Sequence, residues 1–260
     1  MIASNTITLF CLLILFLPLV AFVINIFIGK RLPREGDWVS VGAILITLLL
    51  SLILLISMFI NGDPNFSHEA VLPWIDLGAF KIDLGIWVDN ITIVMLVVVA
   101  LISSMTHLFS IEYMKGDIRY NRYYAYLGLF TFSMNGIVLA NNLMSLYIFW
   151  ELVGVSSYLL IGHWFEKHSA ADASKKAFLT NRVGYIGMFI GIMILFFSIG
   201  TFNINDLVMG INSDSIKDFA TKMIKKLLNA LIQPKVSTYI DAKTWIQKIL
   251  LEEKYGKINS

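Results

Sequence analysis

The stretch NLMSLYIFWELVGVSSYLLIG, residues 142–162, decides the fold and carries the most informative residue of the chain. It is long enough to cross a bilayer, because a transmembrane helix needs about 20 predominantly apolar residues. Glu151 is its only charged residue and lies almost halfway along it. A carboxylate at that depth costs roughly 2.5–3.5 kcal/mol on insertion scales and usually faces a protein interior or a wet cavity. We therefore interpret Glu151 as functional; a structural charge that orients or docks the helix is the alternative.

The composition of the 260-residue chain indicates a membrane protein. It is 57% hydrophobic and 15% charged, with a mean hydropathy of +0.75, which is too apolar for a soluble domain of this length. A formal net charge of +2 gives no indication of nucleic acid as a partner. The single cysteine, Cys11, cannot by itself hold an iron–sulfur cluster or complete a zinc site. We expect no metal site and no redox centre on this chain.

Six apolar stretches of membrane length predict an all-α polytopic membrane protein. They cover residues 7–28, 39–60, 90–110, 123–140, 143–161 and 177–199. Between the second and third, residues 61–89 contain short apolar-rich runs on either side of Gly78-Ala79, a pattern typical of a small β-hairpin. We expect residues 1–210 to form a transmembrane bundle with this hairpin outside the membrane.

The lysines and arginines of the predicted connections fall on alternate sides of the bundle. The second connection has one lysine, Lys81, and the fourth has none. All other cations of the connections follow the first, third or fifth span: Lys30, Arg31, Arg34, Lys115, Arg119, Arg122, Lys167, Lys175 and Lys176. Because cytoplasmic connections are enriched in Lys and Arg, the N-terminus is predicted to lie outside.

Residues 211–260 differ from the rest of the chain. In SIKDFATKMIKKLLNALI, residues 215–232, the apolar residues recur at helical spacing on one face, and lysines lie off that face. A second such stripe follows Pro234. Neither segment has enough apolar length to span a membrane, so the tail is predicted to form lysine-rich amphipathic helices at the interface.

The run SMNGIVLANNLMSLYIFWELVGVSSYLLIGHWFEK, residues 133–167, resembles subunit L of bacterial NADH:quinone oxidoreductase, respiratory complex I, whose mitochondrial counterpart is its subunit 5. WIDLGAFKIDLGIWVDNIT (74–92), HLFSIEYMKGD (107–117), KKAFLTNRVG (175–184) and IGTFNINDL (199–207) are similar to further segments of that family, in the same order. The resemblance covers about residues 5–210 and leaves out the tail. Complete family members continue through further membrane helices, so this sequence corresponds to a truncated, N-terminal part.

The resemblance implies a function for the chain. It implies an enzyme subunit that contributes to a proton path coupled to quinone reduction, with Glu151 on that path. NADH, FMN, iron–sulfur clusters and quinone would be bound by other membrane and peripheral subunits, with no cofactor on this chain, in the bacterial inner membrane. Two alternatives stay open: a subunit of a cation/proton antiporter of the same ancestral fold, and a non-conducting truncated remnant.

Arg182, in the following span, is the second proton-path candidate. Burial favours a protonated carboxyl and a nearby cation favours the carboxylate, so a movable arginine can load and release a proton at Glu151. Counted from residues 162 and 177 at 1.5 Å per residue, however, the two side chains differ in depth by about 8 Å. A long arginine can span much of that offset and reach Glu151, which stays open as an alternative; we favour snorkelling to the headgroups or a contact with another subunit. The family commonly has aspartate three residues after this arginine, where this sequence has Tyr185.

His107 is the third candidate residue. It lies near the cytoplasmic end of the third span, in SSMTHLFS, and is expected either to relay protons from the cytoplasm or to be an interfacial histidine. In the fourth span, the small residue in Asn135-Gly136 predicts close packing against a neighbouring helix.

Overall fold

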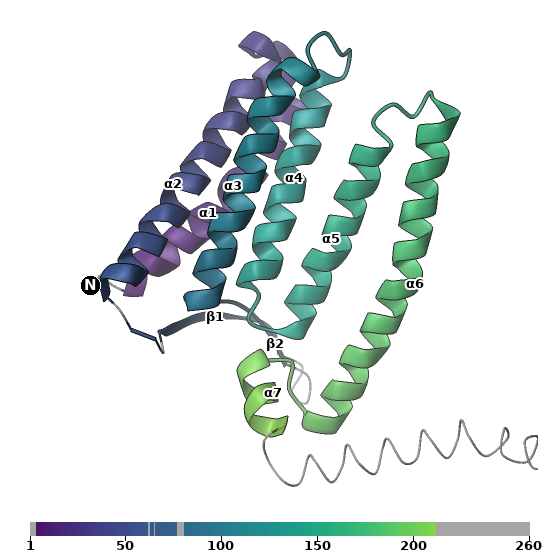
Figure 1. Ribbon diagram of the computed structural model, residues 1–260. Coiled ribbons are helices and arrows are strands. Elements are labelled where there is room, and N and C mark those ends of the chain that lie inside the picture. The colour runs from purple at the N-terminus through teal and green to yellow at the C-terminus, as the bar shows by residue number, and fades with distance from the viewer. Residues whose placement is uncertain (1–3, 62, 65, 77–80, 212–260) are drawn as a thin grey trace, which may run out of the picture. The chain divides into compact units, whose positions relative to one another are not determined.

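The computed structural model is mostly helical, with six long helices and a two-stranded hairpin that crosses one end of them (Figure 1). It describes residues 4–61, 63–64, 66–76 and 81–211. The chain divides into two compact units, Met1–Asp206 and Leu207–Ser260, of which the first is the helical bundle. The amphipathic helices expected beyond residue 211 lie outside the described residues.

The six long helices confirm the predicted all-α membrane architecture. They are α1 (Ser4–Phe27), α2 (Asp37–Asn61), α3 (Asn90–Tyr113), α4 (Tyr120–Leu139), α5 (Leu143–Ile161) and α6 (His168–Ile199). Two short 3-10 turns, η1 (Gly29–Arg31) and η2 (Pro33–Gly36), join α1 to α2, and α7 (Ile204–Ile211) follows α6. Five of the long helices are long and apolar enough to cross a membrane by composition alone, and α4 is the exception among those described.

Helix α4 is less apolar because other helices surround it. It packs against α1, α2, α3 and α5. Several of its polar side chains are buried, and two of them bond inside the protein: Asn135 Nδ2 donates to the Ile14 carbonyl at 3.0 Å, and the Ser133 hydroxyl donates to the Leu129 carbonyl at 2.7 Å. A helix that faces protein rather than lipid does not need a wholly apolar surface, so hydropathy alone understates its place in the bundle.

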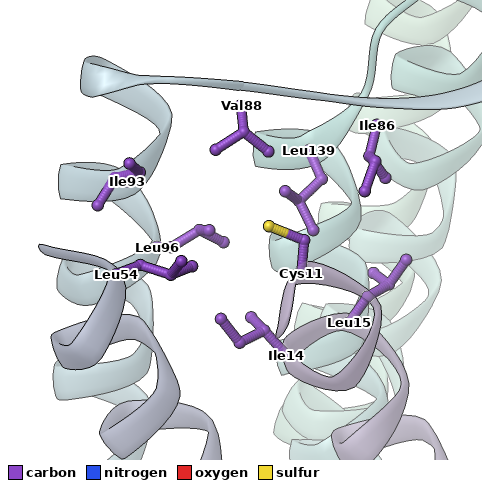
Figure 2. Packing of buried hydrophobic residues seen from close by; sticks show 9 residues of the cluster. All are labelled: Cys11, Ile14, Leu15, Leu54, Ile86, Val88, Ile93, Leu96 and Leu139. Carbon is purple, nitrogen blue, oxygen red and sulfur yellow. The ribbon is translucent and has the colours of Figure 1, made fainter. Parts of the chain in front are cut away.

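The predicted hairpin is present. Strands β1 (Ser67–Asp76) and β2 (Lys81–Asp89) are antiparallel, with Ser67 opposite Asp89. Two residues of β2 point into an apolar cluster with residues of α1 to α4, shown in Figure 2. The buried members of this cluster are Cys11, Ile14, Leu15, Leu54, Ile86, Val88, Ile93, Leu96 and Leu139. Burial of apolar surface therefore holds the hairpin on the end of the bundle.

A carboxylate of the hairpin joins two further connections at that end. Glu69 Oε1 accepts hydrogen bonds from Asn141 Nδ2 at 3.0 Å and from Asn203 Nδ2 at 2.9 Å. Asn141 lies between α4 and α5, and Asn203 follows α6. The next residue, Asn142, caps α5 by accepting a bond from the Ser145 amide at 2.7 Å. The hairpin thus fixes the start of α5 and the end of α6 together.

At the opposite end, the cation-rich connections contact one another. The Arg119 guanidinium binds Glu166 through two hydrogen bonds of 2.6 Å, and Trp164 Nε1 donates to Asp117 Oδ2 at 2.8 Å. The hydrogen bonds from Arg119 hold the pKa of the Glu166 carboxyl below its ordinary value. The connection between α3 and α4 is therefore clamped to the one between α5 and α6.

The predicted start of the sixth helix is wrong by nine residues, since α6 begins at His168 and not at residue 177. The sequence HSAADASKK, residues 168–176, is too polar to count as part of a membrane span. Alanine and lysine are nevertheless among the best helix formers, so the helix continues out of the apolar region.

Close packing at Gly136 is confirmed, and it yields a stability prediction. A Cβ atom on Gly136 would collide with the ring of Phe149 on α5, whereas one on Gly187 of α6 would meet nothing within 4 Å. Gly136→Ala should lower the free energy of unfolding by about 1–3 kcal/mol because the aromatic ring has to move. Gly187→Ala, the matched control, should be neutral or stabilising by up to about 1 kcal/mol. Unfolding by SDS in mixed micelles measures both, and equal stabilities would contradict the packing.

Candidate functional site

Glu151 and Arg182 form a direct ion pair between α5 and α6. Arg182 Nη1 lies 2.7 Å from Glu151 Oε2. Tyr147, one helical turn before Glu151, donates its hydroxyl to Glu151 Oε1 at 2.8 Å. Each oxygen of the carboxylate thus contacts a different side chain, Arg182 on α6 through an ion pair and Tyr147 on α5 through a hydrogen bond.

The expectation that Arg182 would snorkel, or contact another subunit instead of Glu151, is wrong. The depth of Arg182 was counted from residue 177, whereas α6 begins at His168. From the facing ends of the two helices, Glu151 lies about 15 Å from Ile161 and Arg182 about 21 Å from His168. Side chains in a helix lean toward its N-terminus. Because α5 and α6 are antiparallel, Glu151 and Arg182 lean toward each other's level, and the remaining gap closes.

The ion pair lies at the edge of the bundle, between α5 and α6. Helix α5 lies between α6 and α4 (Figure 1). The Glu151 side chain is 18% exposed and that of Arg182 is 45% exposed, so one face of the arginine is open. The guanidinium carbon lies 4.9 Å from the centre of the Phe178 ring, within the range of a cation–π contact. The guanidinium therefore contacts the Glu151 carboxylate and the Phe178 ring, and the rest of its surface is exposed.

Tyr185 lies one turn after Arg182, at the position where the resemblance led us to expect aspartate. It is buried, and its ring covers Gly154 of α5: a Cβ atom on Gly154 would lie 2.9 Å from Tyr185 Cε2. At this position the tyrosine ring packs against α5, and it provides no negative charge for Arg182. Among the described residues, Glu151 is the carboxylate that pairs with Arg182.

This arrangement can couple a proton to a movement of Arg182. With the guanidinium in place, an opposite charge and one hydrogen bond, from the Tyr147 hydroxyl, stabilise the carboxylate. Without it, the Tyr147 hydroxyl would be the one partner left to the carboxylate among the described residues. Tyr147 was not predicted from the sequence, although its spacing of four residues places it on the same helix face as Glu151.

His107 belongs to a separate polar cluster between α3 and α4. Its side chain is fully buried, so the interfacial alternative is wrong. Nδ1 lies 2.8 Å from the Ser103 carbonyl oxygen, and the Tyr124 hydroxyl donates to the His107 carbonyl at 3.0 Å. Nε2 has no hydrogen-bond partner among the described residues. The structure therefore brings Glu151 and Arg182 together and leaves His107 apart from them.

A buried carboxylate near the start of α2 was also missed. Asp37 is 1% exposed and accepts hydrogen bonds from Arg34 at 2.8 Å and from the Tyr120 hydroxyl at 3.1 Å. From the sequence it belongs to a charged connection. The sequence signal was the aromatic and polar start of the fourth helix, YNRYYAY from residue 120, which provides the partners for such a carboxylate.

Two family models match this chain. Residues 74–124 match the model described as NADH-Ubiquinone oxidoreductase (complex I), chain 5 N-terminus. Residues 140–242 match the model described as NADH:quinone oxidoreductase/Mrp antiporter, TM. Together they take in more than half of the chain, and the second extends past residue 210, the expected end of the resemblance.

Curated relatives from chloroplasts and bacteria agree with these models. The chloroplastic NAD(P)H-quinone oxidoreductase subunit 5 of Chlorokybus atmophyticus is 43% identical over 174 residues, 67% of this chain and 26% of that protein. The NADH-quinone oxidoreductase subunit L of Rickettsia typhi is 37% identical over 199 residues, 76% of this chain and 30% of that protein. The matched part of this chain thus spans between a quarter and a third of the length of these relatives.

A solved structure shares the fold. A chain of the membrane-bound sulfane sulfur reductase, an archaeal respiratory membrane complex, superposes with a TM-score of 0.65 at 19% identity, covering 79% of this chain and 40% of that one. The chain belongs to the family of antiporter-like membrane subunits that includes subunit 5 and subunit L of the NAD(P)H- and NADH-quinone oxidoreductases.

Proposed function

We propose that this chain is a membrane subunit, or the N-terminal part of one, of a proton-translocating NADH:quinone oxidoreductase, and that it contributes to a proton path coupled to quinone reduction. The Glu151–Arg182 ion pair is the observation that carries this proposal. Ionisable residues inside membrane helices are costly, and they mark ion paths by default. Family membership supplies the class of complex.

In this proposal Glu151 binds and releases the proton. Arg182 favours release when it is close to the carboxylate, and its movement away favours binding. Tyr147 keeps one oxygen of the carboxylate oriented in both states through its 2.8 Å hydrogen bond. The half-exposed guanidinium is the part that is free to move, because its open face is available to another helix or subunit. His107 would serve at a separate point of the path, nearer the cation-rich end of the bundle.

The proposed setting is the bacterial inner membrane, with the N-terminus outside. The cation-rich connections at one end of the bundle support that orientation. Other membrane and peripheral subunits would bind NADH, FMN, iron–sulfur clusters and quinone, and this chain would bind none of them. One of those membrane subunits, or a further part of the same protein, would cover Arg182.

A cation/proton antiporter subunit is the second candidate. The family model matched by residues 140–242 is named for Mrp antiporters as well as for the oxidoreductase, and that observation favours it. Proton uptake driven by a gradient of a monovalent cation, without quinone reduction, would distinguish this candidate from the first.

A double-mutant cycle on Glu151→Gln and Arg182→Gln should show a coupling of about 1–3 kcal/mol, because each single variant leaves a charge without its partner. Tyr147→Phe removes one neutral hydrogen bond donor and should cost only about 1 kcal/mol. SDS-induced unfolding of each variant in mixed micelles provides the free energies. Additive effects of the two glutamine variants would show that the pair does not form.

Proton pumping should fall several-fold in Glu151→Gln while the protein remains inserted, because glutamine keeps the shape and removes the ionisable group. Glu112→Gln, which alters an exposed carboxylate at the cation-rich end of α3, is the matched control and should pump normally. Proton uptake by inverted vesicles of the assembled complex, measured beside quinone reduction, gives protons per electron. An unchanged ratio in Glu151→Gln would refute the proposed role.

The orientation can be tested by cysteine labelling in intact cells. Lys115→Cys and Lys167→Cys should be protected from an impermeant external thiol reagent, and Ser67→Cys on the hairpin should react. The native Cys11 is fully buried and provides an unreactive background. External labelling at residue 115 would reverse the orientation.

A further inference from the structure

A cavity of about 450 Å³ lies at the cation-rich end of the bundle, between the start of α4, the end of α5 and the first turns of α6. Its volume falls within the roughly 300–1,000 Å³ of ordinary ligand pockets. Polar residues from all three helices and from the α5–α6 connection line it: Arg119, Arg122, Tyr126, Tyr158, His163 and Lys175. It is distinct from the Glu151–Arg182 site, whose residues do not line it.

The lining carries three cations and, among the described residues, no carboxylate. Arg122 has no carboxylate within 4.0 Å in the described part of the chain, and Lys175 lies 3.8 Å from Asp172, with both side chains mostly exposed. Such an exposed pair contributes little and is easily exchanged for another anion. The cavity therefore favours a negatively charged group.

Arg119 presents an unused donor in this cavity wall. Its two terminal nitrogens are bound to Glu166 at 2.6 Å each, while its Nε is buried and has no hydrogen-bond partner among the described residues. Leaving such an N–H without an acceptor is unfavourable. An oxygen-rich ligand in the cavity would remove that cost.

The surroundings of the cavity fit a lipid better than a freely soluble anion. Trp164 and Phe165 beside it are 38% and 57% exposed, and aromatic residues concentrate at the level of the headgroups. On α6, Leu179 is 65% exposed and Val183 is 74% exposed, so an apolar flank leads away from the cavity along the helix. A phosphate in the cavity and hydrocarbon along this flank would satisfy both surfaces at once.

We propose that this cavity binds the phosphate of an anionic phospholipid from the adjacent leaflet, with Arg122 and Lys175 as the principal cations and the acyl chains against α5 and α6. Basic pockets between transmembrane helices bind such headgroups in general. This inference concerns a structural lipid, and it stands independently of the proposed proton path.

The test compares two double variants that remove the same charge. Arg122→Ala/Lys175→Ala strips the cavity, and Lys115→Ala/Lys176→Ala removes two exposed lysines that do not line it. The chain, with whatever subunits accompany it, is purified in mild detergent, and phosphatidylglycerol retained per chain is counted by native mass spectrometry. Phosphatidylcholine serves as the zwitterionic comparison, and an excess of inorganic phosphate as the competitor.

We expect at least a threefold loss of retained phosphatidylglycerol in the cavity variant, no such loss in the control, and restored retention in Arg122→Lys/Lys175→Arg. Equal loss in both double variants would mean that the lipid is attracted by surface charge in general, and would overturn the site. No loss in either variant would overturn it as well. Equal retention of phosphatidylcholine would exclude recognition of the anionic headgroup. Complete displacement by inorganic phosphate would assign the cavity to free phosphate and overturn the lipid.

Discussion

The hydrocarbon of a bilayer does not tolerate an isolated charge, and this constraint decides how α5 and α6 are arranged. A glutamate on one helix and an arginine on the next are each costly alone, but at 2.7 Å they form a neutral unit. The pair requires both helices to keep their axial register. The hairpin provides it at one end through Glu69, and the Arg119–Glu166 clamp provides it at the other. The contacts at the two ends of the bundle thus keep Glu151 and Arg182 at the same level.

The same constraint explains the polar interior around α4, because polar side chains are tolerated where lipid does not reach them. Asn135, Ser133 and His107 are tolerated there because protein, and not lipid, surrounds them. The exterior of α6 is the opposite case, with exposed leucine, valine and isoleucine side chains along its length. Polar side chains are therefore found where protein shields them from lipid. Helix α4, which composition fails to mark as a span, has four buried polar residues, Asn121, Thr131, Ser133 and Asn135.

Apolar length and turn residues were sufficient to predict the helices and the hairpin, because both are dictated by local sequence. The contact between Glu151 and Arg182 could not be predicted in the same way. It depends on where α6 begins, on nine residues that are helical without being apolar, and on the lean of two side chains in antiparallel helices. The burial of Asp37 and His107 likewise depends on partners from distant helices. The position of Glu151 in an apolar stretch and the family resemblance both pointed to this carboxylate, but neither gave information about Tyr147.

The contact between Tyr185 and Gly154 has an evolutionary consequence. As long as residue 185 is tyrosine, its ring occupies the space that any side chain at residue 154 would need. An aspartate at 185 would vacate that space. The two positions are therefore epistatic, and the order of change matters: a lineage can acquire a larger residue at 154 only after it has given up the aromatic ring.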